Sequence, residues 1–434
     1  MLKAKNRLGI VFFPAYDWAI SPAHPEREER LLYTQDQLQE EGVFDIEGIT
    51  EHKPDVAQPD DVSRVHFCIP NVLAVTTESH MISAGGAIKA ARLVMEGAAD
   101  KAFALVRPPG HHAMKVVHGS RGFCSINIEA VMIEHIREHY GQKRIAIVDT
   151  DCHHGDGTQD IYWHDPNTLF ISIHQDGRTL YPGTGFIEDS GGPNARNKTI
   201  NIPLPPETCD EGFIHVIDNV VLPILADFKP DLVVNSAGQD NHYSDPITNM
   251  KFTAQGYALL NQKLNPHIAV LEGGYSIQGA LPYVNCGIAL AMAGLDFSAL
   301  REPDYDPVWL KQDKSVTERI TQVSEKVLEQ YFGPAQSRQF EPGTFVTREK
   351  DIFYDTDMIS EHQRELVMVC YDCAGLIVVK TSSTVNSPAV CIEVPLGACD
   401  RCRDEGIRLL EEARKDGDYR HIKFINRRDK VYLP

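Results

Sequence analysis

The stretch that most constrains the fold of this chain is Ile145 to Gly157, which reads IAIVDTDCHHGDG. Its opening residues form a β-branched apolar run, which is typical of a buried strand, and Gly155 and Gly157 mark the turn that follows. The acids and histidines therefore stand at the carboxyl end of a strand. In open α/β sheets ligands bind at that edge, because the loops there present side chains from a rigid support.

Three side chains of this stretch share one side of the extended chain, because Asp149, Asp151 and His153 are spaced two residues apart. This spacing allows Asp151 and His153 to hold one cation between them. Charged groups beside a buried strand are costly unless a cation or hydrogen bonds compensate them. A solvated acidic turn is the less favoured alternative.

Other strand-like segments end in the same manner. Residues 102–113 read AFALVRPPGHHA, which places His111 and His112 on a Pro-Gly turn. Two imidazoles projecting into one site can accept and return protons near neutral pH. Residues 231–240, DLVVNSAGQD, run from a strand through small residues to Asp240, and IAVLEGGY ends on a glycine pair and Tyr275.

Strands and helices alternate along the chain, which indicates an α/β protein with an open, mostly parallel sheet flanked by helices. Further strands are expected at residues 8–15, 168–174 and 201–205, and helices from Pro22 to about Glu41, at 83–97 and at 211–228. Near the start of the first helix, Arg27 or Arg30 either faces inward to hold an anion or belongs to an ordinary acidic helix start.

Composition argues against some classes of function and indicates the cellular compartment. The 434 residues carry 42 Lys plus Arg against 61 Asp plus Glu, a formal charge of -19, which argues against non-specific nucleic-acid binding by the main body of the protein. Pro14 and Asp17 cut the first apolar segment short of a signal peptide or membrane span. Ten cysteines without a secretory signal indicate reduced thiols, and we expect a cytoplasmic protein that does not bind membranes.

Five motifs in this order resemble the zinc-dependent histone deacetylase superfamily, in its bacterial or class II-like form, which has the arginase–deacetylase fold. The resemblance covers about residues 8–330, and HPER at 24–27 fits it too. The five motifs are RPPGHHA at 107–113, DTDCHHGDG at 149–157, YPGTG at 181–185, SAGQD at 236–240 and LEGGY at 271–275.

The resemblance implies a role for each matching residue. Asp151, His153 and Asp240 would bind a catalytic zinc, and three protein ligands leave the open position that such a zinc requires. His112 would be the general base and acid, oriented by Asp156. The remaining implied catalytic residues are His111 paired with Asp149, and Tyr275 as donor to the developing oxyanion.

The resemblance also implies an aromatic tunnel and a second cation. Phe123 and Tyr181 would flank the aliphatic stem of the substrate, with Gly274 lining the same pocket. A potassium or sodium ion would lie near Asp149, Asp151, His153, Ser172 and Ile173. Two residues depart from the family pattern, Gln239 and Asn241, and we expect these to lie at the pocket rim.

The C-terminal part has a different character. Cys370-Tyr-Asp-Cys373 and Cys399-Asp-Arg-Cys402 form two CxxC pairs, which predict a structural four-cysteine zinc site in a zinc-ribbon-like domain. Rubredoxin-like iron is the alternative metal, and loose buried thiols are the alternative to a site. We expect a catalytic domain at 1–333, a linker at 334–349 and this domain at 350–434, with activity surviving loss of the four-cysteine site because the catalytic ligands lie on a separate sheet.

The sequence therefore predicts a zinc hydrolase that removes acetyl or other short acyl groups from acyl-lysine or acylated amines. An acetylpolyamine or other small-molecule deacetylase is an alternative, and a non-catalytic acyl-lysine binder or scaffold is a weaker one. A two-manganese ureohydrolase on the same fold needs additional carboxylates around its second metal, where this chain offers His111, His112 and Tyr275. From 401 to 430, ten Lys or Arg stand against seven Asp or Glu, so weak nucleic-acid binding by the C-terminal segment is less favoured than a solvated face.

Overall fold

An eight-stranded sheet, in which every neighbouring pair of strands is parallel, forms the centre of the computed structural model, as the alternation of strands and helices predicts. The structure describes residues 2–15, 18–141, 143–334 and 340–433. The strand order is β2-β1-β4-β10-β9-β6-β7-β8. The strands are β1 (Lys3–Phe13), β2 (Glu47–His52), β4 (Lys101–Val106), β6 (Ile145–Asp149), β7 (Thr168–Gln175), β8 (Thr199–Leu204), β9 (Leu232–Ser236) and β10 (Ile268–Val270).

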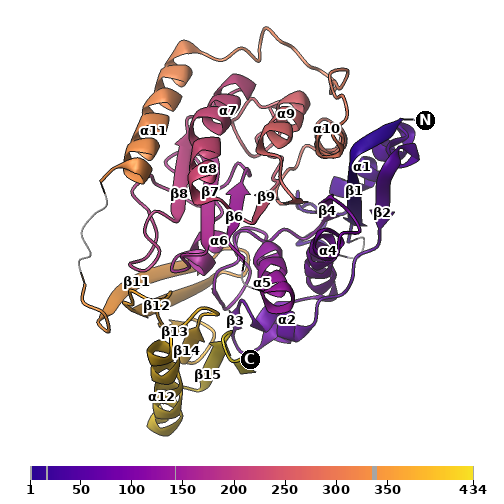
Figure 1. Cartoon of the computed structure of the whole chain (residues 1–434). Coiled ribbons are helices and arrows are strands. Elements are labelled where there is room, and N and C mark those ends of the chain that lie inside the picture. The colour runs from indigo at the N-terminus through magenta and orange to yellow at the C-terminus, as the bar shows by residue number, and fades with distance from the viewer. Residues whose placement is uncertain (1, 16–17, 142, 335–339, 434) are drawn as a thin grey trace.

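Helices cover both faces of this sheet (Figure 1). Side chains alternate across β4, so that Phe103 and Leu105 enter one core while Ala102 and Ala104 enter the other. Both faces are thus apolar, as a parallel sheet between helices requires. The helices are α1 (Glu29–Glu40), α2 (Pro59–Ser63), α3 (Val72–Val75), α4 (Glu78–Met95), α5 (Ile128–Tyr140), α6 (Asp156–Tyr162), α7 (Asp210–Val216), α8 (Leu222–Phe228), α9 (Ala254–Leu264), α10 (Leu281–Ala293), α11 (Lys314–Phe332) and α12 (Asp400–Asp416), with a 3-10 turn η1 (Val43–Asp45).

Two helices differ from the expected ones. The first begins at Glu29 rather than Pro22. Pro25 disfavours helical backbone in His24, which accounts for the irregular backbone before Pro25. The helix expected at 211–228 is interrupted between α7 and α8 by the π turn η2 (Ile217–Val221). Pro223 has no N–H with which to close an ordinary helical turn, and the wider turn accommodates it. Within the described residues, no helix has both the length and the apolar character needed to cross a membrane.

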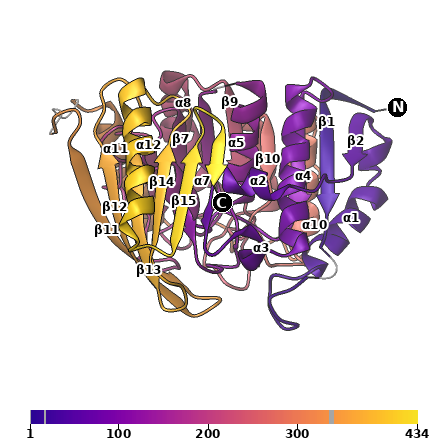
Figure 2. The same cartoon turned by 90° about the horizontal axis from the view of Figure 1, so that it is seen from below.

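The C-terminal module, defined here as residues 345–433, is a six-stranded sheet in the order β11-β12-β13-β14-β15-β16. Only β14 and β15 pair in parallel; the other neighbours are antiparallel. Figure 2 shows α12 lying across one face of this sheet. The strands are β11 (Phe345–Tyr354), β12 (Ile359–Met368), β13 (Ile377–Ser383), β14 (Ala389–Val394), β15 (His421–Asn426) and β16 (Val431–Leu433).

The other face of the module packs against the main body. Val367, Val379 and Cys391 share a buried cluster with Phe67 and Val116, which lie on the short parallel pair β3 (Phe67–Cys68) and β5 (Val116–Val117). Strand β11 begins inside the segment expected as a linker, and residues 335–339 of that segment lie outside the described residues. The division of the chain at residues 334–349 stays a prediction.

Candidate active site and four-cysteine centre

Sheet order brings the sequence motifs together. The neighbouring strands β4, β10, β9 and β6 are parallel, so their carboxyl ends meet at one edge of the sheet. The loops after these four strands carry, in that order, the tandem histidines, the LEGGY motif, Asp240 and the Asp-x-His motif. Residues separated by more than a hundred positions therefore reach one site.

The three expected metal ligands converge. One ligand atom from each of Asp151, His153 and Asp240 lies within 4.8 Å of the others, and all three residues are buried. His153 Nδ1 lies 2.8 Å from Asp240 Oδ2 and 3.3 Å from Asp151 Oδ1. Backbone donors orient the acids, since Gly273 N donates to Asp151 Oδ2 at 2.7 Å and Cys152 N to Asp240 Oδ1 at 2.7 Å.

The electrostatics of this cluster suit a cation. Burial opposes a charge on His153, but the carboxylates of Asp240 and Asp151 outweigh burial and raise the pKa of His153 to about 10. Burial and the neighbouring Asp151 raise the pKa of Asp240. Two buried carboxylates require a positive partner, which is either a protonated His153 or a metal ion bound by a neutral His153. The donor set of one nitrogen and two carboxylates fits zinc with an open position.

Each tandem histidine has its own carboxylate. His112 Nδ1 lies 2.7 Å from Asp156 Oδ1, and His111 Nδ1 lies 3.1 Å from Asp149 Oδ2. Burial, with His111 as the next cause, lowers the pKa of His112 to about 4. A neutral His112 whose Nδ1 is occupied by a carboxylate has its Nε2 free to accept a proton.

The sequence analysis did not single out Glu272, the acid that holds the turn bearing His111 and His112. Glu272 is buried, and its Oε2 accepts hydrogen bonds from Gly110 N at 2.7 Å and His111 N at 3.0 Å. Arg30 in turn donates to the backbone oxygens of Glu272 at 2.6 Å and Gly274 at 2.7 Å. The available signal was the acid inside LEGGY, but its partners are more than 160 residues away in the sequence.

The inward-facing arginine is Arg30. It is fully buried and forms an ion pair with Glu26, which also accepts from Arg107 Nε at 2.7 Å. Arg27 is partly exposed and pairs with Glu29 at 3.3 Å. Arg30 is thus the arginine that faces inward, and the anion that it holds is the side chain of Glu26, four residues earlier in the chain.

Tyr275 is buried, with an exposed fraction of 7%. Its backbone N donates to Asp245 Oδ2 at 2.7 Å, and the Arg30 guanidinium lies 4.9 Å from its ring centroid. Burial raises the pKa of the Tyr275 phenol well above its usual value, so the hydroxyl stays protonated and can donate a hydrogen bond.

The expected entrance residues surround these groups. The Phe123 ring centroid lies 5.6 Å from that of Tyr275, and the Tyr181 ring lies 5.2 Å from that of His112. Tyr181 is 36% exposed, which places it toward solvent. Gly274 has a φ of 120°, and a Cβ there would lie 2.9 Å from Gln239 Cβ, so the position needs glycine.

The two departures from the family pattern are buried rather than at the rim. Gln239 donates from Nε2 to Asn285, and Asn241 donates from Nδ2 to Thr150 O at 2.8 Å; both are fully buried. Their amide nitrogens are bonded inside the fold, while Gln239 Oε1 and Asn241 Oδ1 are buried without a hydrogen-bond partner among the described residues. Because both side chains are buried, the expectation that they shape the rim was wrong.

The expected monovalent cation site remains a prediction. Asp149 on β6 is the register partner of Ser172 on β7, and Ile173 follows Ser172 on the same strand. Ser172 Oγ lies 2.8 Å from His174 Nδ1. Of the five residues implied by the resemblance, Asp149, Ser172 and Ile173 are therefore adjacent in the sheet, while Asp151 and His153 follow β6 in its loop.

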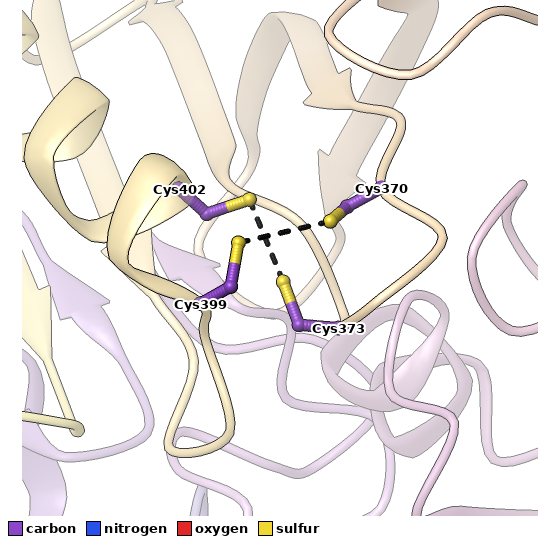
Figure 3. Close-up of side chains that lie close together, drawn as sticks. All are labelled: Cys370, Cys373, Cys399 and Cys402. Carbon is purple, nitrogen blue, oxygen red and sulfur yellow. Dashed lines mark hydrogen bonds between the residues drawn. The ribbon is translucent and has the colours of Figure 1, made fainter.

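The four cysteines gather as the CxxC spacing predicts (Figure 3). Cys370 and Cys373 lie between β12 and β13, while Cys399 and Cys402 lie at the start of α12. Sulfur to sulfur distances are 3.8 Å for Cys370 and Cys399 and 3.5 Å for Cys373 and Cys402, and all four sulfurs lie within 4.8 Å of one another. Thiolates ~2.3 Å from a tetrahedral zinc lie about 3.8 Å apart, so the cluster fits a closed structural site.

The main body of the protein helps to hold this centre. Asn194 Oδ1 accepts from Cys370 N at 3.0 Å, and Asn194 Nδ2 donates to the backbone oxygens of Met368 and Ala374 at 3.0 and 2.8 Å. Arg401 Nη2 lies 3.7 Å from Cys370 Sγ, where it would offset the negative charge of four metal-bound sulfurs. The turn that bears Cys370 and Cys373 is thus contacted by Asn194 of the main body and by Arg401 of the module.

Known proteins resemble this chain over most of its length. A family model of the histone deacetylase domain matches residues 71–286. A probable deacetylase of Archaeoglobus fulgidus is 45% identical over 339 residues, which cover 71% of this chain and 93% of that protein. The acetoin utilization protein AcuC of Bacillus subtilis is 31% identical over 340 residues, covering 70% and 86% of the two chains.

A solved structure is also similar. The HDA15 HD domain superposes with a TM-score of 0.63 at 26% sequence identity and covers 74% of this chain and 94% of that chain. The fold, the buried histidine and carboxylate cluster and these relatives agree. The chain belongs to the histone deacetylase family of hydrolases.

Proposed function

We propose that this protein is a zinc-dependent amidohydrolase that removes acetyl or other short acyl groups from acyl-lysine or acylated amines. The observation that carries the proposal is that three groups converge at one edge of the sheet. They are the Asp151, His153 and Asp240 cluster, the His112 ring paired with Asp156, and the buried phenol of Tyr275. Catalysis of amide hydrolysis uses these three elements: a Lewis acid that polarises the carbonyl, a general base and a donor to the oxyanion.

Asp151, His153 and Asp240 would hold the catalytic zinc. Bound there with an open position, zinc would supply Lewis acidity toward an acyl carbonyl and toward water. Cys370, Cys373, Cys399 and Cys402 would hold a second zinc with a structural role, because four thiolates leave no open position.

His112 would take the proton from the attacking water and return it to the leaving amine. Its neutral state at physiological pH suits the first step. Asp156, 2.7 Å from Nδ1, fixes the ring orientation and stabilises the imidazolium formed on protonation.

Tyr275 would donate a hydrogen bond to the carbonyl oxygen as it gains negative charge. Phe123 and Tyr181 would contact an aliphatic stem with their ring faces, which favours a linear amine such as an acylated lysine side chain. Acetylpolyamines and other small acylated amines present the same stem, so they are the alternative substrates of the same reaction.

The test is a panel of acetyl-lysine peptides and acetylpolyamines, assayed with the zinc-loaded protein for release of acetate. We expect zinc-dependent release from at least one substrate class, with the faster class identifying the substrate. Binding of acyl-lysine peptides without any release would contradict the proposal and support a binding or scaffold function.

A further inference from the structure

The turn of the β11–β12 hairpin contacts a loop of the main body, residues 119–123, at three successive positions. Ser120 N donates to Asp357 Oδ2 at 2.6 Å, Arg121 Nη1 donates to Phe353 O at 2.6 Å, and Gly122 N donates to Asp355 Oδ1 at 3.0 Å. The hairpin thus supplies the acceptors for two backbone donors and one side chain of this loop.

The loop is part of the active-site wall. A Cβ added to Gly122 would lie 2.6 Å from the His112 ring and 2.9 Å from Tyr181 Oη, so the backbone of the loop packs directly between these two residues. Phe123 follows with a φ of 72°, a left-handed conformation that is unfavourable for an aromatic residue. Such a conformation persists only where surrounding contacts hold it.

The Asp355 carboxylate also holds a second residue of the expected entrance, Tyr181. Tyr181 Oη donates to Asp355 Oδ1 at 3.1 Å, and this is the oxygen that accepts from Gly122 N. The Tyr181 ring stands 5.2 Å from the His112 ring. One side chain of the C-terminal module therefore ties together the two segments that bear the expected tunnel walls.

A second line of contacts runs from the hairpin to the general base. Arg121 Nε and Nη2 donate to Asp156 Oδ2 at 2.9 and 2.6 Å, while Asp156 Oδ1 faces His112 Nδ1. Arg121 is 11% exposed in its side chain, so water screens this pair little. The backbone oxygen of Phe353 orients the Arg121 guanidinium that in turn orients Asp156.

We propose that the C-terminal module completes the active site, with Asp355 as a positioning residue for the substrate entrance and Arg121 as a positioning residue for the His112–Asp156 pair. This proposal rests on the proposed amidohydrolase function. It assigns the module a part in substrate binding and catalysis, in addition to the structural metal that it would carry.

The contacts remove the basis for expecting that activity survives loss of the four-cysteine site. That expectation treated the catalytic ligands and the cysteines as parts of separate sheets. The two sheets are indeed separate, but β11 and β12 belong to the cysteine-bearing sheet and their turn lies at the entrance.

Three variants of hairpin acids test the role of Asp355. In Asp355→Ala the acceptor is lost, whereas in Asp355→Asn the amide oxygen can still accept from Gly122 N and Tyr181 Oη. The matched control is Asp351→Ala, because Asp351 lies on β11 with a side chain that is 89% exposed and pairs only with the exposed His362 among the contacts described.

We expect KM to rise about 10- to 100-fold in Asp355→Ala with a smaller change in kcat, because a displaced wall weakens substrate and transition state alike. Asp355→Asn and Asp351→Ala should stay near wild type, with equal metal content in all three. An alanine variant that matches the control would overturn the proposal, and so would an asparagine variant as impaired as alanine.

Arg121→Met tests the second part of the proposal, the role of Arg121 in positioning the His112–Asp156 pair. Because Arg121 acts through Asp156, kcat should fall more than KM rises, and the pH profile of kcat should shift as the Asp156 carboxylate loses its arginine partner. A change in KM alone would refute the role assigned to Arg121.

Hydrogen exchange separates this proposal from the proposed function. The amide of Gly122, whose acceptor is Asp355 Oδ1, should exchange faster in Asp355→Ala than in Asp351→Ala, whatever the substrate. Unchanged exchange would overturn the positioning role, while a wild-type protein that hydrolyses no acylated amine would overturn the proposed function alone.

Discussion

Replacing Glu393 with Gln should loosen the C-terminal module from the main body. Glu393 on β14 is 4% exposed and accepts from Lys115 Nζ at 2.7 Å and from Arg427. Burial opposes its ionisation, but Lys115 and Arg427 prevail and lower its pKa from 4.5 to about 2. Lowering the pKa of this carboxyl from 4.5 to about 2 on folding corresponds to about 3 kcal/mol.

The sign of this contribution follows from the lowered pKa. Stabilisation by ionised Glu393 is fully present above the unfolded pKa of about 4.5 and is lost as pH falls through about 2. The effect of Glu393→Gln should therefore be constant from pH 6 to pH 8. Breaking a buried pair typically costs ~3–5 kcal/mol, in agreement with the value above.

Thiol labelling measures this loosening directly, because Cys391 is buried at the interface between module and main body. Where labelling requires opening of the interface, its rate in Glu393→Gln should rise by at most about 300-fold, because Arg427 belongs to the module and, of these two contacts, only the one with Lys115 crosses the interface. Glu405→Gln is the control, since Glu405 pairs with the exposed Arg408 on α12 and should contribute under about 1 kcal/mol. A Glu393→Gln protein labelled no faster than this control would refute the reasoning.

The remaining predictions concern catalysis and the second metal. Tyr275→Phe should lower kcat by about 10²–10³ with folding and metal content unchanged, because only an oxyanion donor is removed; a near-normal rate would exclude that role. His112→Ala should nearly abolish turnover while both metals remain, and retained turnover would show that another group is the base. Cys399→Ser should lower the metal content from two ions per chain to one and speed hydrogen exchange after about residue 350, since the binding energy of the site is also folding energy. The same variant should lower kcat/KM, because the β11–β12 hairpin belongs to that sheet; unchanged metal content would exclude the structural site.

The sequence predicts the main sheet and the metal ligands because local patterns carry them. Each motif follows an apolar run, and parallel strands bring such ends together, so Asp151 and Asp240 can be placed without knowing any contact. The four-cysteine cluster is equally local, since each CxxC pair forms one knuckle.

The contacts that complete the site are not visible in this way. Asp355 lies 233 residues from Gly122 in the sequence, although it accepts a hydrogen bond from the Gly122 amide. Nothing in the residues that flank Asp355 distinguishes it from the other acids of the hairpin. Whether Arg27 or Arg30 faces inward depends on the path of the chain between Glu26 and Arg30, which the local sequence does not reveal. Gln239 was expected at the rim because its position adjoins a ligand, but the strand end turns its side chain inward to Asn285.

The most direct test of the central claim is zinc titration of chelator-treated protein, with metal content and acetate release measured on the same samples. Wild type should lose turnover on removal of the catalytic metal and regain it as that site refills, reaching two zinc ions per chain. Asp240→Ala should fill only the four-cysteine site and stay inactive, because two remaining ligands rarely hold zinc tightly. Turnover by protein without catalytic-site metal, or zinc-restored activity in Asp240→Ala, would contradict the assignment of Asp151, His153 and Asp240 as the catalytic zinc site.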